Sequence, residues 1–168
     1  MTEKKSVVTG REIKYEGIFS VSELVSTVKE FMSKRGYSYK IGMNVETVKP
    51  HGKFIKIEAT FKRTINEYCT YEVGLEYIFE NIKEVEVVRE GTKLRMNKGK
   101  AMISINSYVM TDYEGYWEKS PITYVMRHLM QKFILGDPHK RWMDDVKKDV
   151  GDVVAEINAF FNLQKLDR

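Results

Sequence analysis

The stretch YCTYEVGLEYIFE, residues 68–80, alternates between apolar and charged side chains. One side of an extended chain would carry Tyr71, Val73, Leu75, Tyr77 and Phe79, and the other side Glu72, Glu76 and Glu80. A period of two with one apolar face predicts a half-buried β-strand. The glutamates predict that its second face is in water.

Segments on both sides of this strand alternate in the same way. We predict strands at residues 11–19, 39–48, 53–63 and 101–110, with Ile41, Met43 and Val45 on one apolar face of residues 39–48. The tripeptide REG joins KEVEVV to TKLRMN and predicts a further hairpin. Together these segments predict an antiparallel sheet of about six strands, with one face wet and one face covered.

The first helix is predicted by its start and stop signals. Ser20 and Glu23 form a capping box before a run of apolar residues at helical spacing, and Gly36 ends that run.

Two further helices are predicted near the C-terminus. Ser120-Pro121 is an N-cap followed by proline and starts a short helix at residues 121–135. A long helix follows at about residues 139–164 and is long enough to lie across a whole sheet. We therefore expect a single α+β domain, residues 1–168, with the three helices covering one sheet face.

The composition is that of a packed protein, with 42% hydrophobic and 31% charged residues in a chain of 168. The formal net charge of +4 is mild, and lysine and glutamate alternate along most segments. Contact with nucleic acid is therefore not the first expectation. We find no signal peptide and no membrane-spanning run, and the single cysteine fits a reducing compartment. We expect a cytoplasmic protein, with a virion component as the alternative.

The order strand, helix, antiparallel meander, long C-terminal helix resembles the helix-grip fold of the START, Bet v 1 and polyketide-cyclase-like superfamily. The resemblance is one of topology, and no sequence motif of that superfamily stands in this chain. It implies a non-catalytic module that holds an apolar small molecule or lipid between sheet and helix. The residues expected to line such a cavity are Tyr71, Tyr77, Val109, Met126, Met130 and Trp142.

The residues that could carry catalysis do not form a recognisable group. His51, His128 and His139 have no second ligand at metal spacing. A lone cysteine, Cys69, is more often a small buried hydrophobe than a nucleophile. We therefore lean away from an enzyme and expect no metal or cofactor.

An interaction or assembly protein is the alternative function, such as a scaffold or a virion-type subunit. The stretch DYEGYWEKSP (112–121) sets aromatic rings at a corner, where they either cover the end of the core or anchor a partner. The basic stretch REGTKLRMNKGK (89–100) either binds anions or protects a sheet edge. The candidate partner-binding residues are Tyr113, Tyr116, Trp117, Arg89, Lys93 and Arg95.

Overall fold

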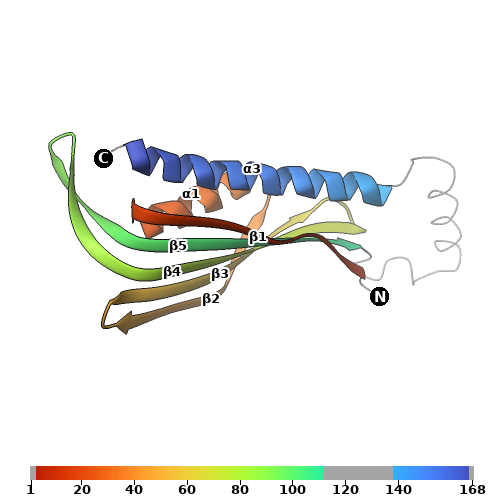
Figure 1. The fold of residues 1–168 in the computed structure, drawn as a ribbon. Helices are drawn as coiled ribbons and strands as arrows, with labels where there is room; N and C mark the ends of the chain where they lie inside the picture. Colours follow the sequence, from red (N-terminus) through yellow and green to blue (C-terminus); the bar gives the residue numbers. More distant parts are fainter. Residues whose placement is uncertain (1–2, 112–137, 167–168) are drawn as a thin grey trace, which may run out of the picture.

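Five long strands form one antiparallel sheet in the computed structural model, which describes residues 3–111 and 138–166. Along the chain, the elements are β1 (Glu3–Phe19), α1 (Val21–Lys34), β2 (Ser38–Lys49), β3 (Gly52–Thr64), β4 (Cys69–Arg89), β5 (Thr92–Thr111) and α3 (Pro138–Leu166). Figure 1 shows α3 running along the length of the sheet, with α1 on the same side.

The strands lie in the order β1-β5-β4-β3-β2. Strands β2 to β5 are a simple meander, and β1 pairs with the last strand rather than with β2. Strands β1 and β2 therefore flank α1 in the sequence but form opposite edges of the sheet.

The predicted fold class is confirmed: the chain is α+β, with an antiparallel sheet and a long C-terminal helix. The prediction of about six strands was too high for the described residues. The hairpin predicted around REG is not a separate pair of strands but the far end of β4 and β5, which run through without a break. The predicted helix at residues 121–135 lies outside the described residues.

Both predicted ends of α1 are confirmed. The Ser20 hydroxyl accepts a hydrogen bond from the Glu23 backbone N–H at 3.3 Å. At the other end Gly36 has a φ of 82°, and the backbone N–H of Tyr37 donates to the carbonyl of Met32. This left-handed glycine satisfies the last carbonyls of the helix.

The core lies between one face of the sheet and the two helices. Leu24, Val28 and Met32 of α1 are buried, and Val153 and Ile157 of α3 are fully buried in the same cluster. The opposite sheet face carries ion pairs such as those of Lys56 with Glu58 and Glu76, at 2.9 and 2.7 Å. The predicted division into a wet and a covered face is therefore present.

Strands β4 and β5 stay paired through an irregularity opposite Gly99. The register shifts between Glu80 and Lys83, and Asn81 has a φ of 54°. A β-carbon on Gly99 would lie 2.7 Å from the Glu80 carbonyl oxygen and 2.6 Å from the end of the Ile82 side chain. Only glycine fits at this bulge, which lets the two strands bend toward the helical side in Figure 1.

We predict that Gly99→Ala lowers the free energy of unfolding by about 1–3 kcal/mol, because a methyl group would displace the backbone of β4. Urea unfolding monitored by circular dichroism measures the change. Gly151→Ala on α3 is the matched control, since its added β-carbon would meet nothing within 4 Å beyond its neighbours in the same helix. The control variant should be neutral or more stable by up to about 1 kcal/mol, and an equal loss in both variants would contradict the role of Gly99.

Candidate interaction surface

The predicted cavity residues that the structure describes lie in the hydrophobic core or against it. Tyr71 and Tyr77 are fully buried beneath the helices, and Trp142 is half-buried against the same core. Met126 and Met130 lie outside the described residues.

Aromatic rings fill much of the space between the sheet and α3. Tyr15 of β1 stacks on Phe161 of α3 with ring centroids 4.3 Å apart, and Phe19 meets the same phenylalanine edge-on. Tyr77 and Phe79 stack beside each other on β4. The contacts of Phe161 pack β1 directly against α3.

Val109, another predicted cavity residue, is buried but borders a pocket of about 140 Å³. The pocket lies where β5 ends and α3 begins, and its other lining residues are Glu3, Lys5, Thr111, His139 and Met143. It is too small for a lipid or a drug-sized ligand, which need about 300 Å³ or more.

A polar cluster that the sequence analysis missed joins α1, the sheet and α3. Asp149 of α3 is buried and accepts hydrogen bonds from the Tyr37 hydroxyl at 2.7 Å and from Arg35 at 2.9 Å. Arg63 approaches the same carboxylate at 3.7 Å, and Arg35 also pairs with Asp152 at 2.8 Å. Burial and the bond to Asp149 raise the pKa of Tyr37.

The spacing of three acids on α3 was the available signal for this cluster. Asp145, Asp149 and Asp152 fall at i, i+4 and i+7, and so share one helix face beside the apolar stripe. Tyr71 donates to Asp145 at 3.3 Å, so the row meets two tyrosines of the sheet side. Each of these carboxylates forms a hydrogen bond or ion pair with a residue outside α3. We call this set of contacts the brace, because it holds α3 against the rest of the fold.

Removing the central acid should therefore destabilise the fold. We predict that Asp149→Asn lowers the free energy of unfolding by about 2–4 kcal/mol, because Tyr37, Arg35 and Arg63 all lose a charged partner. Thermal unfolding by calorimetry measures the change. Glu12→Gln, which removes an exposed partner of Lys14, is the control and should cost less than about 0.5 kcal/mol. A loss at Asp149 no larger than in the control would contradict the brace.

Cys69 is fully buried, and burial raises the pKa of its thiol to about 12. The thiol therefore stays protonated at neutral pH and is not an activated nucleophile. Within residues 3–111 and 138–166, no group of three or more His, Cys, Asp or Glu side chains could hold a metal ion.

The raised thiol pKa has a consequence for stability at high pH. The unfolded chain loses this proton near its ordinary pKa of 9.0, whereas the folded chain holds it until about 12. Stability from this group is therefore full below pH 9 and falls as the pH rises between the two values. Buried Tyr37, Tyr71 and Tyr77 also have raised pKa values and act in the same direction above their ordinary range.

We predict that wild-type protein loses about 1–2 kcal/mol more than Cys69→Ala between about pH 7 and about pH 10.5. Urea unfolding of both proteins at the two pH values measures the difference. Because the cavity left by the substitution lowers stability equally at both values, it cancels in this comparison. Identical losses in the two proteins would contradict a thiol pKa raised by folding.

The predicted basic residues lie at the far end of the β4–β5 hairpin. Arg89 is half-buried and donates to Gln164 of α3 at 2.7 Å, so it fastens the hairpin to the helix. Lys93 and Arg95 are exposed, with Arg95 directly opposite Glu86. The three cations therefore do not form one anion-binding group. Tyr113, Tyr116 and Trp117 lie outside the described residues.

A group of exposed apolar side chains lies on β2, the edge opposite β1. Val48 is 76% exposed, Ile41 50%, Met43 43% and Val45 42%. An edge strand also presents unpaired backbone N–H and C=O groups along its outer side. Apolar side chains and free backbone groups on one strand are the features that allow another strand to pair there.

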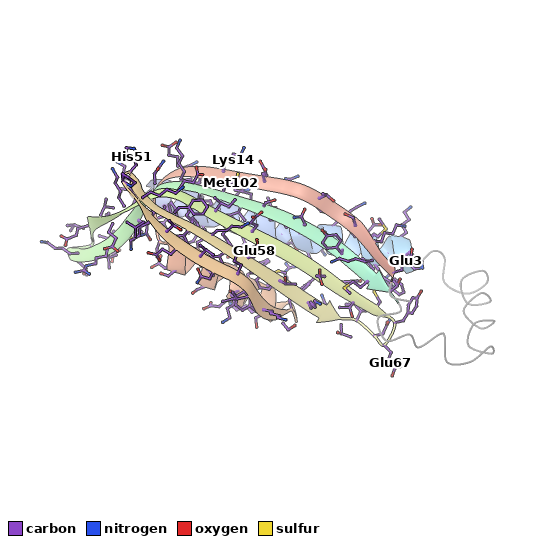
Figure 2. All side chains as sticks on the ribbon, turned by 90° about the horizontal axis from the view of Figure 1, so that it is seen from below. Glu3, Lys14, His51, Glu58, Glu67 and Met102 are labelled. Atoms are coloured by element: carbon purple, nitrogen blue, oxygen red, sulfur yellow. The ribbon has the colours of Figure 1, made fainter. Side chains whose placement is uncertain are left out.

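Gly42 changes which face these side chains occupy. Ile41 lies opposite buried Ala59, but Met43 lies opposite Glu58 and Val45 opposite Lys56, with one extra residue on β2 between Ile41 and Met43. Directly paired residues project to the same face. Ile41 therefore faces the helices, whereas Met43 and Val45 join the outer face that Figure 2 shows with Glu58 and Met102. The prediction of one shared face was wrong, because spacing does not reveal a bulge.

The features that hinder another strand from pairing with β2 lie at the two ends of the strand. Lys40 and the bulge at Gly42 precede the exposed segment, and Lys49 follows it. The segment between them, residues 43–48, has no lysine, proline or register shift. Its one charge, on Glu46, is paired with Lys53 of β3 at 3.1 Å.

The chain matches no known family model and no curated protein at a significant level. No described helix is long and apolar enough to cross a membrane.

Proposed function

We propose that this protein is a non-catalytic interaction module that binds an extended segment of a protein chain along the β2 edge. The observation that carries the proposal is the exposure of Ile41, Met43, Val45 and Val48 on an unpaired edge strand. The hydrophobic core between the sheet and α3, and the hydrogen-bonded acids of α3, support a rigid scaffold behind that edge.

In this kind of binding, backbone hydrogen bonds supply the affinity and side-chain contacts supply the specificity. Backbone hydrogen bonds to the free side of β2 hold an added strand without regard to its sequence. Apolar side chains on both faces of β2 then favour a strand with β-branched residues opposite them. Met43 and Val45 supply one face, and Ile41 and Val48 the other.

The apolar-ligand hypothesis stays a prediction. It has less support than the edge, because Tyr71 and Tyr77 are buried among core side chains and Val109 borders a pocket of only about 140 Å³. The edge hypothesis needs no space inside the molecule.

A peptide-binding measurement tests the proposal. The probe is a pool of fluorescent synthetic peptides, each about ten residues long, in which valine or isoleucine alternates with threonine or lysine. We predict saturable binding by anisotropy, together with slower hydrogen exchange of β2 backbone amides. The Met43→Lys/Val45→Lys double variant should bind at least about tenfold more weakly, since two charges replace apolar contacts on the outer face.

Val88→Lys is the matched control, because Val88 is 64% exposed on β4, away from the β2 edge. It changes an exposed valine of a strand to lysine without touching β2, so binding should be unchanged. No saturable binding to any peptide, or equal losses in both variants, would overturn the proposed function.

A further inference from the structure

We infer that the extended segment bound at this edge is β2 of a second copy of the chain, paired antiparallel about a twofold axis at Val45. This inference rests on the proposed function and names its partner. Two five-stranded sheets would join into one continuous sheet, with the helices of both copies on the same face.

The choice of register is argued from the side chains of residues 43–47. A twofold axis perpendicular to the sheet pairs residues whose numbers have an even sum, because paired side chains share a face. An axis at Glu46 would oppose two glutamates, which is unfavourable. An axis at Val45 instead opposes Val45 to its copy, Met43 to Thr47, and Asn44 to Glu46. Among residues 43–47, every pair in this register is apolar or free of like charges.

The bulge extends the match beyond residue 43. Because Gly42 is an extra residue on β2, the next pair is Ile41 with Val48 of the second copy. Both side chains face the helical side. Ile41 is opposite buried Ala59. Val48 shares the face of Glu46, two residues earlier, and Glu46 pairs with Ile55. All four exposed apolar side chains of β2 thus meet a neutral side chain of the second copy.

The same register opposes Lys40 to Lys49 of the second copy at each end. Both side chains lie on the outer face, where Lys40 is opposite Thr60 and Lys49 covers the Phe54 ring at 4.7 Å. Two like-charged pairs weaken the contact without preventing it. The pairing is therefore of the small, transient class, below about 1,200 Å² of buried surface.

The other edge of the sheet explains why the partner is β2 rather than β1. Strand β1 has register shifts at Ser6–Val8 and Val8–Arg11, and Gly10 has a φ of 64°. Lysines or arginines stand at positions 4, 5, 11 and 14. A strand so interrupted and charged does not accept an edge-to-edge neighbour. Pairing of β2 with β1 would also continue into a filament, whereas pairing of β2 with itself closes as a dimer.

A charge exchange at the strand ends tests the register. Lys49→Glu sets a glutamate opposite Lys40 of the second copy, and Lys40→Glu makes the equivalent pair with Lys49. Each single variant should dimerise about fivefold more tightly in sedimentation velocity run over a concentration series. The double variant sets glutamate against glutamate and should return to roughly wild-type affinity.

Comparing the single and double variants distinguishes an effect of the strand register from an effect of overall charge. Each exchange lowers the net charge by two, so the double variant falls from +4 to zero and would be the tightest dimer if only general repulsion mattered. Lys14→Glu on β1, which makes the same single change away from β2, should leave the affinity within about twofold.

A cysteine at the axis tests the pairing directly. Val45→Cys should form an intermolecular disulfide under mild oxidation, because residue 45 faces its own copy. Thr47→Cys should not, since the two sulfurs would be about four residues apart along the strands, or about 13 Å. Cys69 is buried, and the unsubstituted chain is its control.

A monomer at every concentration, with no cross-link in the Val45→Cys variant, would overturn the self-pairing. If alternating peptides still bind at β2 in that case, the proposed function holds and only the identity of the partner is wrong. If the peptides also fail to bind, both proposals fall. Equal cross-linking of Val45→Cys and Thr47→Cys would overturn the register.

Discussion

Antiparallel pairing of β1 with β5 decides where everything else in this fold lies. It joins the first strand to the last over a register that runs from Glu3–Thr111 to Phe19–Asn97. Tyr15 and Phe19 then lie beneath Phe161 of α3, so the start of the chain is packed against its end. Because β1 takes that side of the sheet, β2 becomes the opposite edge, although only α1 and a short turn separate the two strands in sequence.

The same arrangement brings the acids of α3 against residues of the sheet and of the α1–β2 connection. The acids of α3 that could have made a reactive site are held by Tyr37, Arg35 and Tyr71. Asp149 is buried and hydrogen-bonded, and removing one partner of such a buried charge is strongly destabilising, so this contact fixes α3 on the sheet. These contacts hold α3 in a fixed position on the sheet.

The sequence predicts the elements of this fold well, because each depends on local signals. The alternation of residues 68–80 and the cap at Ser20 are both present where expected. What a pattern does not contain is the pairing of distant strands. The bulges at Gly42 and Asn81 add residues to one strand only, so they become visible when the partner strand is known. That is why Met43 and Val45 were placed on the wrong face, and why β4 and β5 were each divided in two.

Edge strands in natural sheets are protected along their length, and β1 follows that rule with two register shifts and four cations. Strand β2 follows it only at its ends, at Lys40, Gly42 and Lys49. If β2 only had to avoid pairing with other strands, exposed valines at positions 45 and 48 would be unfavourable. A single valine-to-lysine change would then remove that risk. The same pattern is what a limited, reversible contact requires: an apolar centre that pairs, and charged ends that stop the pairing from spreading. The contrast between the two edges, rather than the exposure of any one side chain, is therefore the physical reason to place the interaction at β2.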